Sequence, residues 1–215
     1  MFLSRIFTLY PEYFPGYLNK GLFGKAMNEK IWNLETVNIR DYTFDKHKTV
    51  DDTPYGGGNG MLIKADVLAK SLDENIKEKE KIIYLSPKGK LFDHKYAKEL
   101  STEKTLNLIC GHFEGIDERI IQSRNIEEVS IGDFVLSGGE VATFVVLDAI
   151  LRFVPGVLGN ENSTQEESFE NGLLEYPQYT KPQIWEDKSV PDVLLSGDHA
   201  KIKDWRLSQS EAITR

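Results

Sequence analysis

The chain has 215 residues, 40% of them hydrophobic, so it can bury a core in one large domain or in one ordinary domain plus a small one. Its formal net charge of −8 argues against broad, nonspecific nucleic-acid binding, which needs a basic face, but not against one local basic patch. The single cysteine, Cys110, excludes an intrachain disulfide and a cysteine zinc site, and it favours a reducing cytoplasm.

Strands and helices are expected to alternate along the first 154 residues. The N-terminus lacks a signal-peptide pattern, and no apolar run approaches the roughly 18 residues of a membrane span. Apolar runs predict strands at 5–9, 34–39, 82–85, 106–110 and 129–131. Helical patterns predict helices from Pro11 and at 65–79, 94–100, 118–124 and 140–154, with Asp117 capping the fourth.

This alternation predicts an α/β fold, a parallel sheet with helices on both faces. Three successive strands end in loops that contain glycine, at 86–89, 111–115 and 132–139. Because the carboxyl ends of parallel strands form the ligand crevice, these loops indicate a flat organic ligand held largely by backbone groups.

The segment 40–60 is predicted to be a long polar loop, and such loops are often functional or mobile. Its GGGNG string fails the dinucleotide pattern because the sixth position is Met61. No phosphate-binding P-loop pattern occurs anywhere in the chain, so an NTPase of that type is not expected. His112-Phe113-Glu114 fits half of a zinc-deaminase signature, but the P-C-x-x-C half is missing.

Three regions are expected. Residues 1–159 form the cofactor-binding domain, 160–176 form a mobile acidic linker with five glutamates and no basic residue, and 177–215 form a small domain that is largely helical from about His199.

Several strings stand in order: VDDTPYGGGNGM, YLSPKG, CGHFEGIDER, SIGDFVLSGGE, RFVPGVLG, ESFENGLLEYPQYTKP and VPDVLLSGDHAKIKDWR. Together they resemble the bacterial tRNA (guanine-N1)-methyltransferases of the SPOUT superfamily over nearly the whole chain. The resemblance implies a C-terminal trefoil knot in the sheet domain, which overrides the general rarity of knots. It also implies S-adenosylmethionine as cofactor, magnesium for activity, and a cytoplasmic homodimer whose active sites are shared between subunits. The substrate would be the guanine on the 3′ side of the tRNA anticodon, whose methylation prevents frameshifts.

The resemblance also assigns residues. Glu167 would be the base that removes the guanine N1 proton, with Glu166 as the alternative, and Arg152 would stabilise the charge on O6. The small domain would bind tRNA, and members of the family usually continue beyond the position of Arg215. The cofactor would contact Tyr84, Leu85, Ser86, Pro87, Gly111, Phe113, Glu114, Gly115, Ser130, Ile131, Gly132, Asp133, Phe134, Val135, Leu136, Gly138 and Gly139.

The assignment of the residues that contact the substrate is less specific. His47, Asp51, Lys181, Lys201 and Arg206 are the candidates for tRNA contacts, and His47 and Asp51 could equally be plain surface residues. His112 stands where the family commonly has arginine, and no metal-ligating set is evident. Two alternatives stay open: a related knotted methyltransferase for another RNA or base, and a non-catalytic adenosine- or RNA-binding module.

Overall fold

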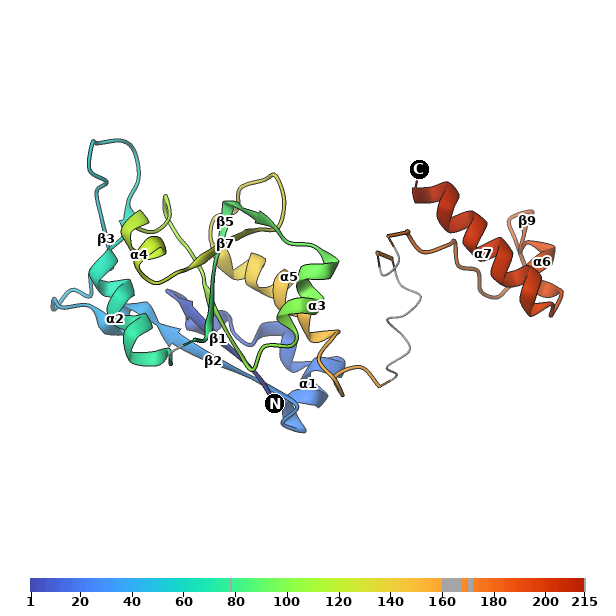
Figure 1. Ribbon diagram of the computed structural model, residues 1–215, viewed down its shortest axis with the longest axis horizontal. Helices are drawn as coiled ribbons and strands as arrows, with labels where there is room; N and C mark the ends of the chain where they lie inside the picture. The colour runs from blue at the N-terminus through green and yellow to red at the C-terminus, as the bar shows by residue number, and fades with distance from the viewer. Residues whose placement is uncertain (78, 160–167, 170–171, 215) are drawn as a thin grey trace. The chain divides into compact units, whose positions relative to one another are not determined.

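A five-stranded parallel sheet forms the centre of the first of two compact units, Met1–Gly159 and Asn160–Arg215 (Figure 1). The computed structural model describes residues 1–77, 79–159, 168–169 and 172–214. The strand order is β2-β1-β6-β5-β7, and every neighbouring pair is parallel. The strands are β1 (Phe2–Thr8), β2 (Trp32–Asn38), β5 (Lys81–Leu91), β6 (Thr105–Ile109) and β7 (Glu127–Ser130).

Helices cover both faces of this sheet, which confirms the predicted α/β class (Figure 1). On one face lie α1 (Gly21–Asn28), α3 (His94–Leu100) and α5 (Gly139–Leu151). On the other lie η3 (Ile39–Tyr42), α2 (Ala65–Asn75) and α4 (Glu118–Ser123). The 3-10 turns η1 (Pro11–Tyr13) and η2 (Gly16–Asn19) replace the single helix expected from Pro11.

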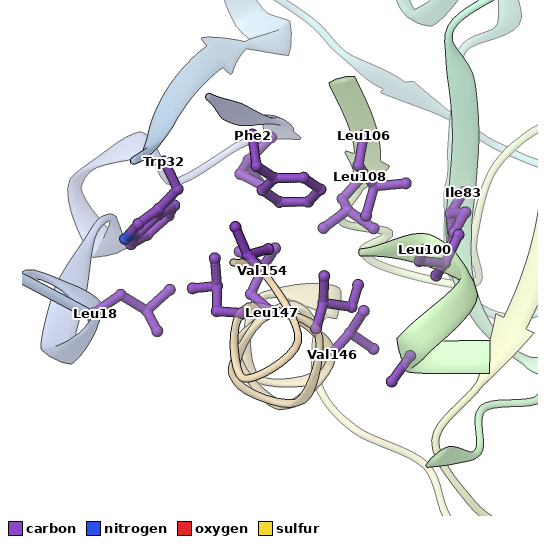
Figure 2. Packing of buried hydrophobic residues seen from close by; sticks show 14 of the residues in the cluster. Phe2, Leu18, Trp32, Ile83, Leu100, Leu106, Leu108, Val146, Leu147 and Val154 are labelled. Carbon is purple, nitrogen blue, oxygen red and sulfur yellow. The ribbon is translucent and has the colours of Figure 1, made fainter. Parts of the chain in front are cut away.

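Successive strand residues belong to different cores because side chains alternate across a strand. Ile6 and Leu108 pack into the core beneath α5, whereas their neighbours Phe7 and Ile109 pack beneath α2 and α4. Figure 2 shows the first core, where Val146 and Leu147 of α5 face Phe2 and the strand residues. All these side chains are at most 4% exposed, so the sheet is buried on both faces as its apolar runs predict.

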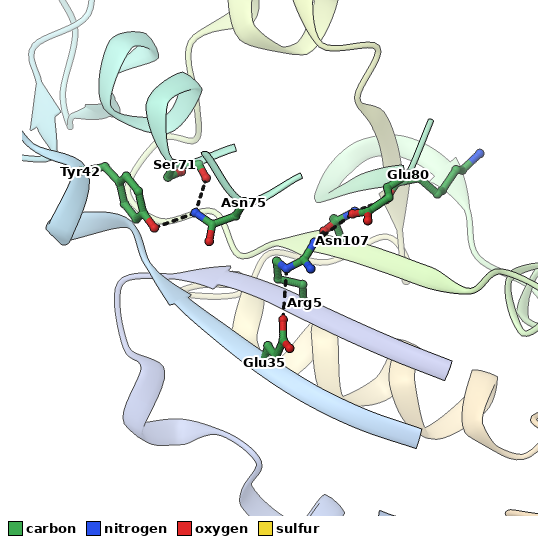
Figure 3. A network of polar contacts seen from close by, with 8 residues as sticks. Arg5, Glu35, Tyr42, Ser71, Asn75, Glu80 and Asn107 are labelled. Atoms are coloured by element: carbon green, nitrogen blue, oxygen red, sulfur yellow. Dashed lines mark hydrogen bonds and ion pairs between the residues drawn. The ribbon is translucent and has the colours of Figure 1, made fainter. Parts of the chain in front are cut away.

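Strand β5 is longer than expected. It continues past the predicted loop to Leu91, because Leu85 and Lys90 both align with Val129 and the four residues between them bulge out of the ladder. Helix α2 is shorter, ending at Asn75, whose side-chain amide donates to the Ser71 carbonyl and to the Tyr42 hydroxyl (Figure 3).

The long polar segment is not wholly irregular. Its β3 (Asp51–Asp52) pairs antiparallel with β4 (Leu62–Ile63). In the second unit, helix α7 (His199–Thr214) confirms the helix expected from His199, and α6 (Asp192–Leu195) precedes it. The hairpin of β8 (Ile184–Trp185) and β9 (Lys188–Ser189) was not predicted. No helix in the described ranges is long and apolar enough to cross a membrane.

Candidate active site

A cavity of about 290 Å³ opens at the carboxyl ends of β5, β6 and β7. Its size is near the lower end of the range for small-molecule sites. The three loops that the sequence singled out form its walls. All of the predicted cofactor residues line it except Asp133, which is exposed on the third loop: Tyr84, Leu85, Ser86, Pro87, Gly111, Phe113, Glu114, Gly115, Ser130, Ile131, Gly132, Phe134, Val135, Leu136, Gly138 and Gly139.

The first wall is the bulge of β5. The segment 86–89 leaves the sheet and returns to pair with β7, so both ends of the bulge are fixed to the same neighbouring strand. Gly89 lies so close to the Glu128 and Val129 backbone that an added Cβ would overlap it. The wall is therefore anchored at its base by strand pairing rather than by loop contacts alone.

The second wall is a tight turn after β6. Gly115 N donates to His112 O at 3.0 Å, while Phe113 and Gly115 adopt left-handed φ values of 59° and 116°. The long segment before α2 holds this turn from outside, since Glu114 N donates to Met61 O and Ile63 N donates to Gly115 O, both at 2.9 Å. The turn is thus fixed by backbone bonds on both of its sides.

The third wall follows β7 and ends at the start of α5. The Ser130 hydroxyl donates to Gly132 O at 3.1 Å and accepts from Gly132 N at 3.2 Å, which folds the start of this loop on itself. Phe134 and Val135 line the cavity yet are 52% and 84% exposed, so this wall presents apolar surface to solvent as well.

Buried polar groups lie behind the walls. Glu140 is 4% exposed and accepts a hydrogen bond from Thr8 Oγ1 at 2.6 Å. His112 Nε2 lies 2.9 Å and 2.8 Å from the two Glu140 carboxylate oxygens. Cys110 Sγ is 3.2 Å from Thr143 Oγ1, and burial, with the Glu140 carboxylate second, raises the pKa of the Cys110 thiol.

The cavity lining carries more negative than positive charge. Three carboxylates, those of Glu114, Glu118 and Glu128, line it together with the Lys88 ammonium. Burial and the nearby Glu128 raise the pKa of Tyr84 to about 12, so this phenol stays neutral at physiological pH. Such a lining suits a ligand that bears positive charge.

Several lining residues were missed by sequence reasoning, namely Lys88, His112, Ile116, Glu118, Ile121, Glu128, Val129, Ser137 and Ala142. Most of these missed residues are adjacent in sequence to a predicted one, and this adjacency could have identified them as lining residues. Glu118 and Ile121 of α4 had no such signal, because only the packing of α4 beside Tyr84 brings them to the cavity.

The predicted site residues Arg152, His47 and Asp51 of the first unit do not line the cavity. Arg152 caps the far end of α5, roughly 20 Å along the helix from Gly139 at about 1.5 Å per residue. His47 is exposed in the long segment, and Asp51 belongs to β3. Glu166 and Glu167 lie outside the described residues. Lys181, Lys201 and Arg206 belong to the second unit, where Lys201 pairs with Asp198 at 3.2 Å and Arg206 stacks on Tyr176 at 4.7 Å.

Comparison with known proteins places these features in a family. The family model described as tRNA (Guanine-1)-methyltransferase TrmD matches residues 2–215. The chain belongs to this family. A tRNA (guanine-N(1)-)-methyltransferase of Pelagibacter ubique is 74% identical over 215 residues, covering 100% of this chain and 94% of the relative. Proteins of the same name from Bartonella tribocorum and Brucella canis are 55% and 51% identical over 214 residues, covering 92% and 87% of those relatives.

Membership of the tRNA (guanine-1)-methyltransferase family makes the three-loop cavity the candidate site for methyl transfer. The match spans both units, so the family resemblance found in the motifs is confirmed along the whole chain. In the part of the chain that the structure describes, no group of three or more His, Cys, Asp or Glu side chains is arranged to hold a metal ion.

Proposed function

We propose that this chain transfers a methyl group from S-adenosylmethionine to N1 of the guanine on the 3′ side of the tRNA anticodon. The observation that carries the proposal is the match of residues 2–215 to a family named for methyl transfer to guanine in tRNA. The methylated guanine would help to keep the reading frame, and the reaction would take place in the cytoplasm.

The cavity residues fit S-adenosylmethionine. Loops rich in backbone N–H and C=O groups can read the edge of an adenine without long side chains, and Phe113 and Phe134 add flat apolar walls. The three lining carboxylates offset the positive amino and sulfonium groups. When bound, S-adenosylmethionine supplies an electrophilic methyl carbon on sulfur.

The chain must supply a base, because guanine N1 carries a proton and becomes a good nucleophile only as that proton leaves. Tyr84 and Cys110 are protonated at neutral pH, since burial raises the pKa of each. Glu167, or Glu166 as the alternative, would take the proton from guanine N1 as N1 accepts the methyl group that S-adenosylmethionine would supply. Arg152 stabilises the negative charge that develops on guanine O6.

A homodimer would explain how Arg152 can act, although it lies at the end of α5 away from the cavity of its own subunit. The first two turns of the outward side of α5 are apolar, with Val141 and Val145 59% and 47% exposed, and a stripe of this kind favours burial against a second copy. Two α5 helices packed antiparallel would bring the partner's Arg152 toward the Gly139 end, where the cavity opens.

The trefoil knot is part of the same proposal. It is supported by the close passage of the third loop against the second, where Gly139 N donates to Gly111 O at 2.9 Å. Magnesium also remains a proposal from the family. The described side chains offer no cluster that suits it, so no step is assigned to the metal.

Methyl transfer from labelled S-adenosylmethionine to two tRNA transcripts tests the function. The transcripts are identical except for guanine or adenine directly 3′ of the anticodon. Label only on the guanine transcript is the expected result. Label on both would move the target to another base, and label on neither, with cofactor still bound, would favour a non-catalytic module.

A further inference from the structure

His112 and Glu140 form a shielded contact where the second and third walls meet, and His112 itself lines the cavity. The ring nitrogen Nε2 lies within 2.9 Å of both carboxylate oxygens. The two side chains are only 14% and 5% exposed, so solvent and salt screen this contact weakly. An Nε2–H group at this position donates to the carboxylate, which only accepts hydrogen bonds.

Thr8 fixes the other side of the same carboxylate. Its hydroxyl donates to Glu140 Oε1 at 2.6 Å and accepts from Tyr10 N at 2.9 Å, and the residue is fully buried at the end of β1. The Tyr10 ring meets the His112 ring edge-on, with centroids 5.0 Å apart. One carboxylate therefore joins β1, the second loop and the start of α5.

Backbone contacts tie the two loops together at the same place. His112 and Gly138 form an isolated antiparallel bridge, and Gly139 N donates to Gly111 O at 2.9 Å. Directly after His112 the chain turns through Phe113 at a φ of 59°. A left-handed non-glycine residue is strained and persists only where its surroundings fix it. His112, held by Glu140 and by the bridge to Gly138, is the residue that precedes this turn.

We propose that His112 is a positioning residue for the cofactor. Held by Glu140 and Thr8, it keeps the second and third loops at the separation that closes the cavity around S-adenosylmethionine. This inference rests on the proposed function, because it takes that cofactor as the ligand. His112 acts through the two loops and exchanges no proton with the reacting atoms.

Calorimetric titration of full-length protein with S-adenosylmethionine tests the role. Since His112→Ala removes a charge-assisted hydrogen bond, it should weaken binding and raise the cofactor KM about tenfold, with kcat at saturation changed less than about twofold. His112→Gln can place an amide N–H near the position of Nε2, so it should restore most of the affinity. Hydrogen exchange at Gly139 N–H should accelerate in the alanine variant and recover in the glutamine variant.

The control breaks a comparable bond elsewhere. Glu80→Gln weakens the contact with Arg5, at 2.9 Å, and should lower stability while leaving cofactor affinity unchanged. If His112→Ala does not fold, Thr8→Val carries the test, because it removes the hydroxyl bonds with Glu140 and with Tyr10 N and leaves His112 in place.

Failure of the proposed function can be distinguished from failure of the positioning role. Wild-type protein that binds no S-adenosylmethionine would overturn the proposed function, and the positioning role with it. Wild-type binding together with unchanged affinity in both His112→Ala and Thr8→Val would overturn the positioning role only. A loss in His112→Ala that His112→Gln does not recover would also count against it.

Discussion

Gly139 lies against the backbone of the neighbouring loop, at the point where the third wall becomes α5. A Cβ added there would come within 2.6 Å of Cys110 Cα and 2.9 Å of Gly111 N, closer than real atoms approach. Both of those atoms belong to backbone that is itself tied to Gly139 by a hydrogen bond. Glycine is required here by the close approach of two chain segments.

Gly139→Ala is therefore expected to push the second and third loops apart. Cofactor affinity should fall at least about tenfold, and the free energy of unfolding should fall by about 1–3 kcal/mol, the usual cost of overpacking. Calorimetry and denaturant unfolding measure the two effects. Gly159→Ala is the matched control, because a Cβ there meets no heavy atom within 4 Å. Equal affinity in the two variants would refute the close-contact explanation.

Gly138 shows that a glycine motif does not by itself reveal how a substitution would affect the site. The motif suggests that a side chain at this position enters the cavity. The structure instead directs an added Cβ at the His112 ring and the Glu140 carboxylate. A larger residue would disturb the contact between these two side chains, and it would change the cavity through His112, which lines it.

Glu167→Ala is expected to abolish turnover and leave cofactor affinity nearly intact, because the base acts on the guanine proton and not on the cofactor. Single-turnover methylation and calorimetry separate the two effects. Glu166→Ala is the matched variant one residue earlier and should keep most of the activity. The reverse pattern would assign the proton transfer to Glu166.

At the scale of elements, a buried arginine network links β1, β2 and β6 (Figure 3). Arg5 Nη1 donates to Asn107 Oδ1 and to Glu80 Oε2, both at 2.9 Å, and Nε donates to Glu35 at 3.3 Å. Asn107 in turn donates to Lys81 O at 3.0 Å. The network satisfies polar groups that lie among the apolar residues of the sheet.

Arg5→Ala should lower the free energy of unfolding by about 3 kcal/mol, because it leaves Asn107 and Glu80 without their shared donor in a poorly hydrated place. Urea unfolding followed by circular dichroism measures the change. Lys48→Ala, which removes an exposed pair with Asp41, should cost less than about 0.5 kcal/mol. Similar losses in both variants would mean that the arginine network adds nothing beyond a surface pair.

The outer side of α5 gives a second prediction for a single element. Val141→Glu places a charge on the apolar stripe and should convert the proposed homodimer to monomer, because an unpaired charge is costly in a buried interface. Sedimentation velocity measures the oligomeric state. Leu195→Glu, at a residue 48% exposed in the second unit, should leave it unchanged. Persistence of a dimer in Val141→Glu would locate the interface elsewhere.

At the scale of the whole molecule, the first unit holds both hydrophobic cores and every wall of the cavity. Among the described residues of the second unit only Ser210 is buried. A fragment of residues 1–159 should accordingly fold and bind S-adenosylmethionine like the full chain. It should not methylate tRNA, because Glu167 and the predicted substrate residues of the small region are missing. Calorimetry and methyl-transfer assays check both statements, and tRNA methylation by the fragment would contradict the second.

Local patterns were sufficient for most of the first unit. The limits of α3 and the Asp117 cap follow from neighbouring residues, and Asp117 does accept from Arg119 N. Features set by distant pairing were not predictable. The return of β5 depends on its alignment with Val129, and the β8–β9 hairpin has two-residue strands and a tight turn through Glu186 and Asp187. For the site, the three walls followed from glycine-rich strand ends, whereas the separation of Arg152 from them follows from the length of α5.

The strand order has a consequence for synthesis on the ribosome. Strand β1 is made first, yet one of its two sheet neighbours is β6, and the bond between Arg5 and Asn107 joins residues 102 positions apart. Until β6 has emerged, that side of β1 is an open edge that can pair with other chains. Closing contacts of such long range is slow. A nascent chain of this protein is therefore most vulnerable to aggregation before residue 109 leaves the exit tunnel, and chaperone binding should concentrate in that interval.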